Sequence, residues 1–209
     1  MVKTLKGNIV SKSSKIIIGG CSFTDKDFPI INKRDMKIRY NRDVDLSDVK
    51  VWPEIIKEKT TYEVINLGVC GYDNSQILNS LLDEVSKHDS KEIAFVIAAW
   101  TEWPRNLKSN YVETTLNYMN TFDLYCINKE VDYRQIQMCN IKKEELFKDV
   151  VKHSMLYELD KSKIIGFPMF KLGGGFDGED LIGNNIDKSE HPNKRGHEIL
   201  AETILGSLK

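Results

Sequence analysis

One segment of the chain, residues 15–24 (Lys-Ile-Ile-Ile-Gly-Gly-Cys-Ser-Phe-Thr), constrains the fold more than any other. Its three consecutive isoleucines are β-branched and favour a strand that is buried on both faces, as in a parallel sheet. Gly19 and Gly20 then allow the backbone to turn sharply. The turn places Ser22 just beyond the carboxyl end of the strand, where open α/β sheets bind their ligands. Ser22 is therefore either a turn residue or a nucleophile.

Strands and helices alternate along the rest of the chain. Apolar runs predict strands at residues 16–20, 63–69, 93–100 and 163–170, with a short fifth strand at 180–182. Helical spacing of apolar residues predicts helices at 51–59, 73–88, 110–128, 141–159 and 193–208. The alternation predicts an α/β fold, a three-layer α/β/α sandwich with a central parallel sheet, flavodoxin-like in strand order. We expect one domain over residues 1–209, with two long loops at 25–48 and 172–185 shaping a pocket.

Composition and charge exclude several classes of protein. The net charge is −1, from 30 basic and 31 acidic residues. The chain therefore has no excess of positive charge to drive strong binding to nucleic acid. The longest apolar run, residues 93–100, is too short to span a bilayer. The first seven residues lack the apolar stretch of a signal peptide. We expect a cytoplasmic protein with no nucleic-acid or membrane partner, whose oligomeric state the sequence leaves open.

The four cysteines do not form a recognisable metal or redox motif. Cys21, Cys70, Cys126 and Cys139 contain no C-x-x-C pair, and none lies near a histidine at the spacing of zinc ligands. Reduced thiols with structural roles are therefore the favoured interpretation. We expect no metal and no organic cofactor.

Polar residues follow three of the predicted strands and precede the last predicted helix. The first strand leads to Ser22, the second to Gly71, and the third to Thr101, while His191 lies just before the final helix. A nucleophilic serine needs a base within hydrogen-bond reach and backbone N–H groups aimed at the developing oxyanion. His191 is the candidate base, and the N–H groups of Ser22 and Gly71 are the candidate donors.

Four sequence blocks, in this order, resemble the SGNH/GDSL hydrolase family, and most of all its short members from phage genomes. The blocks are residues 20–24 (Gly-Cys-Ser-Phe-Thr), 66–71 (Asn-Leu-Gly-Val-Cys-Gly), 99–102 (Ala-Trp-Thr-Glu) and 187–193 (Asp-Lys-Ser-Glu-His-Pro-Asn). The resemblance extends over about residues 15–207. It implies the SGNH hydrolase fold, with Ser22 as nucleophile, His191 as base and Gly71 as an oxyanion donor.

The chain departs from the family pattern beside the nucleophile and in the third block. Cys21 replaces the usual aspartate before the serine. Thr101 stands where the family has its oxyanion asparagine, and the threonine hydroxyl offers a hydrogen bond from a shorter side chain. The resemblance therefore implies that Thr101 donates a hydrogen bond to the oxyanion, from a side chain shorter than that of asparagine.

The fourth block departs from the pattern at the acid. The family has an aspartate three residues before its histidine, and here that residue is Lys188. Asp187 lies four residues before His191 and is the favoured acid, provided that the loop accommodates one extra residue. Glu190 is an alternative, and a Ser–His dyad without an acid is another.

The resemblance implies a serine esterase or deacylase that acts on a small acyl ester, an acetylated sugar being one candidate. Acyl transfer to another alcohol uses the same chemistry. The alternative is a catalytically inactive SGNH-fold binding or structural protein of phage origin. A third hypothesis makes Cys21 the nucleophile. The distance from the Ser22 hydroxyl to the His191 ring discriminates between the first two.

Several further residues have a structural interpretation that we prefer to a catalytic one. We expect Asn74 to cap the helix that follows it and His197 to face outward from the last helix. Arg105 is expected in a structural ion pair rather than on a substrate anion. Trp100 and Trp103 are expected to pack in the core beyond the third strand.

Overall fold

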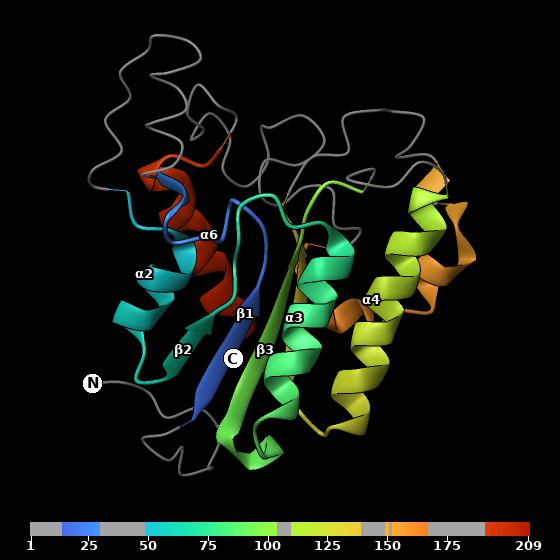
Figure 1. Ribbon diagram of the computed structural model, residues 1–209, viewed down its shortest axis with the longest axis horizontal. Helices are drawn as coiled ribbons and strands as arrows, with labels where there is room; N and C mark the ends of the chain where they lie inside the picture. The colour runs from blue at the N-terminus through green and yellow to red at the C-terminus, as the bar shows by residue number, and fades with distance from the viewer. Residues whose placement is uncertain (1–13, 30–48, 104–109, 139–148, 151, 167–190) are drawn as a thin grey trace, which may run out of the picture.

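The computed structural model describes residues 14–29, 49–103, 110–138, 149–150, 152–166 and 191–209. At its centre lies a four-stranded sheet in the order β2-β1-β3-β4, and all neighbouring strands are parallel (Figure 1). The strands are β1 (Lys15–Gly19), β2 (Glu63–Asn66), β3 (Ile93–Trp100) and β4 (Tyr133–Gln137). The predicted α/β fold with a parallel, flavodoxin-like sheet is confirmed.

The isoleucine run forms the centre of this sheet. Ile16, Ile17 and Ile18 have no exposed surface, and β1 is paired with β2 on one side and β3 on the other. Burial of a whole isoleucine side chain contributes about 1.5–3 kcal/mol relative to leaving it exposed. This strand therefore anchors the turn that follows it, and with that turn Ser22.

Helices cover both faces of the sheet, as Figure 1 shows: α3 and α4 lie on one side, and α2 and α6 on the other. Their bounds are α2 (Trp52–Lys59), α3 (Asn74–Ser86), α4 (Tyr111–Asn128) and α6 (Lys194–Ser207). An ion pair between Lys59 and Glu202, with a nitrogen–oxygen distance of 3.4 Å, links α2 to α6. The predicted three layers are present, and these four helices begin and end within two residues of their predicted bounds.

Strand β4 was not foreseen, because its side chains are mostly polar. Arg134, Gln135 and Gln137 are all buried. Gln135 reaches into the layer of α4, where its Nε2 donates to the Oδ1 of Asp123 at 2.6 Å. Polar residues enter a core when specific partners satisfy them, and such partners are not visible in a hydropathy pattern.

The strand predicted at residues 163–170 is wrong over the part that the structure describes. A short 3-10 helix occupies Lys161–Lys163, and Ile164 makes a single parallel bridge to Gln135 of β4. Residues 167–170 and the strand predicted at 180–182 lie outside the described residues.

The helix predicted at residues 141–159 is confirmed only in fragments. Residues 149–150 and 152 are helical, but Ser154–Tyr157 forms a 3-10 helix in place of the predicted α-helix. Residues 141–148 lie outside the described part of the chain.

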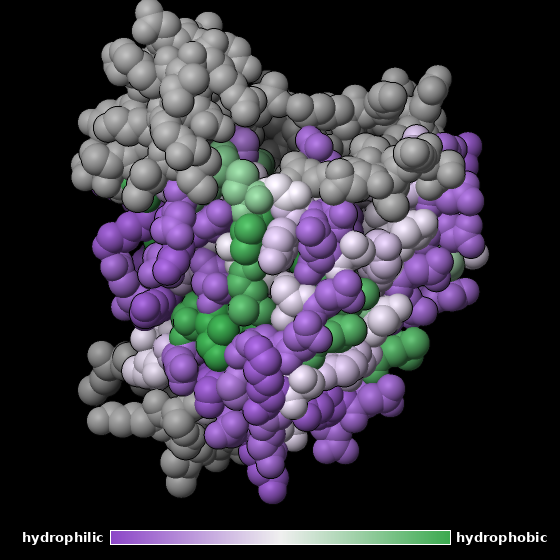
Figure 2. Space-filling model, viewed as in Figure 1, coloured by the Kyte–Doolittle hydropathy of each residue, from purple (hydrophilic) through white to green (hydrophobic). Residues whose placement is uncertain are grey.

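The face of the molecule that carries α3 and α4 is mostly hydrophilic (Figure 2). An apolar strip runs beside α3, over the edge strand β2 and the segment that follows it, where Val64, Ile65 and Leu67 are only partly buried. Within the described ranges, no helix is both long enough and apolar enough to cross a membrane.

Candidate active site

The hydroxyl of Ser22 and the imidazole of His191 meet at the carboxyl end of β1. Ser22 Oγ lies 2.9 Å from His191 Nε2, a hydrogen-bond distance. Ser22 is 5% exposed, and His191 is partly buried. The structure thus brings together the predicted nucleophile and the predicted base.

A tight turn after β1 holds Ser22 in place. The N–H groups of Thr24 and Asp25 both donate to the carbonyl oxygen of Cys21, at 2.8 and 3.0 Å. Ser22 lies inside this turn, which we call the nucleophile turn (residues 21–25). Cys21 has no exposed surface, which does not favour the hypothesis that its thiol is the nucleophile.

The beginning of α6 positions His191. Asn193 caps the helix, its side chain accepting the N–H of Gly196 at 3.0 Å, and His191 precedes this cap by two residues. Capping of this kind contributes about 1 kcal/mol to a helix. The predicted base is therefore attached to the capped end of a helix.

Two phenylalanine rings pack against the imidazole. The ring centroids of Phe23 and His191 are 4.9 Å apart, and those of Phe28 and His191 are 4.3 Å apart. Such contacts restrict rotation of the imidazole about its side-chain bonds. Sequence reasoning missed both residues; the only available signal was the position of Phe23 directly after Ser22.

His197 is buried, so the expectation that it faces outward from the last helix is wrong. It lies in α6 and is 4% exposed. Burial, together with the nearby charge of His191, lowers the pKa of His197 to about 3. His197 is therefore neutral at physiological pH, and it adds no positive charge beside the base.

Residues Val69–Tyr72 form a tight turn that presents Gly71. The N–H of Tyr72 donates to the carbonyl oxygen of Val69 at 3.2 Å, and Gly71, third in the turn, has a φ of +91°. Cys70, second in the turn, is not among the described residues with positive φ. These are the features of a type II turn, whose third position favours glycine. A Cβ on Gly71 would meet no atom within 4 Å, so the glycine is required for its backbone angle and not by crowding.

Backbone and side-chain hydrogen bonds join the nucleophile turn to the segment that follows β2. Val69 N–H donates to the carbonyl of Gly20 at 3.2 Å, and the Nδ2 of Asn66 donates to the carbonyl of Thr24 at 2.8 Å. Gly68 allows this close approach, because a Cβ there would come within 2.7 Å of the Thr24 carbonyl carbon. The two predicted donor segments are therefore fixed relative to each other.

Thr101 lies at the end of β3 with no exposed surface. Its N–H donates to Oδ1 of Asn74 at 2.8 Å, and its carbonyl accepts from Nε2 of Gln137 at 3.0 Å. The expectation that Asn74 caps α3 is wrong: Asp73 is the cap, in a capping box with Gln76. Because Asp73 accepts the N–H group at the start of α3, the side chain of Asn74 is available to accept the N–H of Thr101.

The comparisons with known proteins place this geometry in a known fold. No protein-family model and no curated protein matches the chain. Among solved structures, a lipolytic G-D-S-L family protein from Veillonella parvula superposes with a TM-score of 0.56 at 16% identity, covering 92% of this chain and 97% of that one. TesA superposes with a TM-score of 0.62 at 12% identity, covering 94% and 98%. The fold is that of the G-D-S-L lipolytic proteins.

A third similar structure within this G-D-S-L fold is a psychrotrophic esterase, EstA, from Pseudoalteromonas, solved with the inhibitor monoethylphosphonate. It is 13% identical, with a TM-score of 0.57, and covers 93% of this chain and 96% of its own. The resemblance predicted from the four sequence blocks is thus confirmed for the fold.

The other residues singled out from the sequence have structural roles or lie outside the described residues. Trp100 and Trp103 are buried, as expected, and their indole N–H groups donate to Gln135 and Gln137 at 2.7 and 2.8 Å. The predicted acid Asp187, its alternative Glu190, and Arg105 lie outside the described residues. Among the residues described, no cluster of histidine, cysteine or acidic side chains could hold a metal ion.

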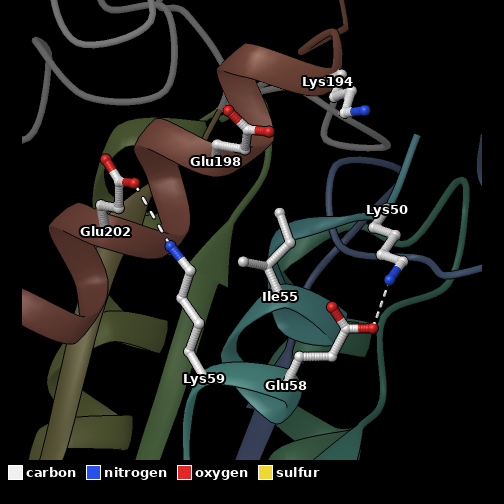
Figure 3. Close-up of a pocket in the computed structure, with 7 residues that line it drawn as sticks. All are labelled: Lys50, Ile55, Glu58, Lys59, Lys194, Glu198 and Glu202. Atoms are coloured by element: carbon white, nitrogen blue, oxygen red, sulfur yellow. Dashed lines mark hydrogen bonds and ion pairs between the residues drawn. The ribbon is translucent and has the colours of Figure 1, made fainter. Parts of the chain in front are cut away.

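A hollow of about 310 Å³ lies elsewhere on the G-D-S-L fold, between α2 and α6 (Figure 3). Lys50 pairs with Glu58 there, and Lys59 with Glu202, so its charges are largely balanced within the protein. The remaining lining residues are Ile55, Lys194 and Glu198. None of the predicted site residues lines it, and we assign it no part in the chemistry.

Proposed function

We propose that this chain is a serine hydrolase that cleaves a small acyl ester, with Ser22 as nucleophile and His191 as base. The observation that carries the proposal is the 2.9 Å separation between Ser22 Oγ and His191 Nε2. A serine hydroxyl is a weak nucleophile until a neighbouring base removes its proton, and neutral imidazole is suited to this at physiological pH. The distance favours a hydrolase over an inactive scaffold, in which nothing requires the two groups to meet.

The proposed reaction proceeds in two halves. Nε2 of His191 takes the hydroxyl proton as Ser22 Oγ forms a bond to the ester carbonyl carbon, giving a tetrahedral oxyanion. The carbon–oxygen bond to the alcohol then breaks, and the protonated His191 gives its proton to the departing alcohol. Water repeats the sequence on the acyl-enzyme, releasing the acid and restoring Ser22.

The oxyanion requires hydrogen-bond donors aimed at the position where its charge develops. We assign this role to the backbone N–H groups of Ser22 and Gly71. The open space around Gly71 supports the assignment, because no side chain of its own blocks the approach of a substrate. Thr101 remains a predicted third donor, and its complete burial means that a substrate oxygen must reach well into the site to meet its hydroxyl.

Asp187 is the proposed acid that accepts the second ring proton of His191. An acid in this position holds the tautomer that leaves Nε2 free to accept a proton and stabilises the imidazolium that forms. The packing of Phe23 and Phe28 against the imidazole supports the same orientation. We propose that acid and aromatic contacts orient the base together.

The similar structures support an ester as substrate. EstA is described as an esterase, and Axe2 from a Geobacillus species, with a TM-score of 0.51 at 12% identity, is described as an acetyl-xylooligosaccharide esterase. An acetyl or other short acyl ester, on a sugar or another alcohol, is therefore the proposed substrate class. The proposed chemistry uses protein groups alone.

The proposal is tested by labelling with a fluorophosphonate probe, followed by peptide mass spectrometry. The probe should label Ser22 in the wild type, not in Ser22→Ala, and much more slowly in His191→Ala. Ser80→Ala is the matched control, because that hydroxyl only donates to the carbonyl of Ile77 within α3. Absence of labelling in folded wild-type protein, or an adduct on Cys21 instead, would overturn the proposal.

A further inference from the structure

We infer that Asp25 is a positioning residue that holds the turn of Gly71, the proposed oxyanion donor, against the nucleophile turn. The inference rests on the proposed function. It assigns a task to a side chain three residues after Ser22 that does not itself contact the reacting atoms.

Both carboxylate oxygens of Asp25 are engaged. Oδ1 accepts the N–H of Asp27 at 2.9 Å, which closes a local turn of the Asx type. Oδ2 accepts the N–H of Cys70 at 2.8 Å, across an interval of 45 residues. Asp25 is 8% exposed whereas Cys70 is exposed, so this hydrogen bond is partly buried. The side chain therefore connects the turn that carries Ser22 to the turn that carries Gly71.

The hydrogen bond to Cys70 acts on the peptide unit next to the proposed donor. In a type II turn the second and third residues share a central peptide, and here that peptide carries the N–H of Gly71. Rotation of this peptide converts the turn to type I and reverses the direction of the N–H. Glycine resists this rotation less than other residues, because it populates positive and negative φ with similar ease. A carboxylate that fixes Cys70 therefore helps to fix the direction of the Gly71 N–H.

Substitution can separate the two hydrogen bonds of Asp25. Serine can close the local turn to Asp27 with its hydroxyl, but it is too short to reach the N–H of Cys70 as well. Asp25→Ser therefore removes the connection to Cys70 and retains the local turn. Asp27→Ala is the matched control, because Asp27 is exposed and contributes only its backbone N–H, which alanine keeps.

The test measures hydrolysis of p-nitrophenyl acetate by the full chain. We expect Asp25→Ser to lower kcat about tenfold while KM stays within about twofold, since outright loss of one oxyanion donor costs about 10²–10³ in kcat. Asp27→Ala should retain the wild-type kcat. Asp25→Ser combined with Gly71→Ala should be hardly slower than Gly71→Ala alone, because both changes act on the same donor.

Three results would overturn the inference in a wild type that hydrolyses the ester. They are an unchanged kcat in Asp25→Ser, a loss that appears in KM instead, and losses that multiply in the double variant. If Asp25→Ser shows no cooperative thermal unfolding, Asp25→Thr replaces it with the same expectation, because it retains the hydroxyl and fills more of the space. If the wild type neither hydrolyses the ester nor reacts with the fluorophosphonate probe, the proposed function is wrong, and this inference is wrong with it.

Discussion

The imidazole of His191 lies against the phenyl ring of Phe28, with ring centroids 4.3 Å apart and planes inclined at 30°. Phe28 follows Ser22 by six residues, so one short segment supplies both the hydroxyl that the imidazole meets and a surface on which the imidazole rests. Orientation of the proposed base therefore depends on residues close to the proposed nucleophile in sequence, as well as on the predicted acid.

Phe28→Leu should lower kcat by a factor of about three to ten. An aromatic pair contributes about 0.5–1.5 kcal/mol beyond its buried area, and 1.36 kcal/mol corresponds to tenfold in rate. The measurement is steady-state ester hydrolysis. Phe95→Leu is the control, because Phe95 packs edge-on against Tyr62, away from the carboxyl end of β3. An equal loss of kcat in both variants would show that the effect comes from a general loss of packing and not from the contact with His191.

Ser22→Ala and His191→Ala should each lower kcat by at least about a thousandfold, and the double variant should be no slower than either. Residues that act as one unit in catalysis show this strong non-additivity. The measurement compares initial rates of the three variants at one pH, with thermal unfolding as a check of the fold. Losses that multiply in the double variant would contradict a shared role.

Asn74→Ala should lower the free energy of unfolding by about 1–3 kcal/mol, the cost of leaving a buried donor without its acceptor. The donor is the N–H of Thr101, which has no exposed surface. Asn79→Ala, in the same helix at an exposed position, should change stability by less than about 0.5 kcal/mol. Urea denaturation gives both values. Similar values for the two alanine variants would argue against a structural role for the Asn74–Thr101 contact.

His197 should make the fold less stable in mild acid. Its pKa is about 3 in the folded protein, below the value of about 6.5 expected when unfolded, so the unfolded chain binds the proton more readily. The contribution of neutral His197 to the free energy of unfolding is complete above about pH 6.5 and is lost as the pH falls toward 3. The free energy of unfolding should fall by about 2 kcal/mol between pH 7 and pH 5 for this reason.

His197→Phe should therefore show a smaller loss of stability than the wild type between pH 7 and pH 5, measured by urea denaturation at each pH. Comparison within each protein cancels the change in packing that phenylalanine introduces. An equal loss in both proteins would assign the acid sensitivity to other groups.

The sequence was most informative where one kind of side chain dominates an element. The isoleucines of β1 and the apolar run of β3 identified the sheet, because burial on both faces leaves no room for polar residues. The leucines of α3, repeated at helical spacing, identified that helix equally well.

Prediction failed where polar residues are buried with partners from distant parts of the chain. Gln135 and Gln137 made β4 look like a surface segment, although Asp123, Trp100 and Trp103 satisfy them in the core. A single sequence does not reveal such pairings, because the partners are separated in the chain and brought together only by the fold.

In the candidate site, the four sequence blocks and the family that they resemble were enough to pair Ser22 with His191. The supporting contacts were not foreseen: those of Asp25 with Cys70, and of the phenylalanine rings with the imidazole. They depend on backbone angles and side-chain directions within turns, and many residue combinations are compatible with those. The acid predicted at Asp187 stays a prediction.

His191 lies just before α6, far along the chain from Ser22. During synthesis Ser22 and the whole of β1 leave the ribosome long before His191, which follows 169 positions later. The histidine lies two residues before the cap of α6, a helix that packs against α2. In the proposed mechanism, the newly made Ser22 therefore has no base beside it until His191 has also been synthesised.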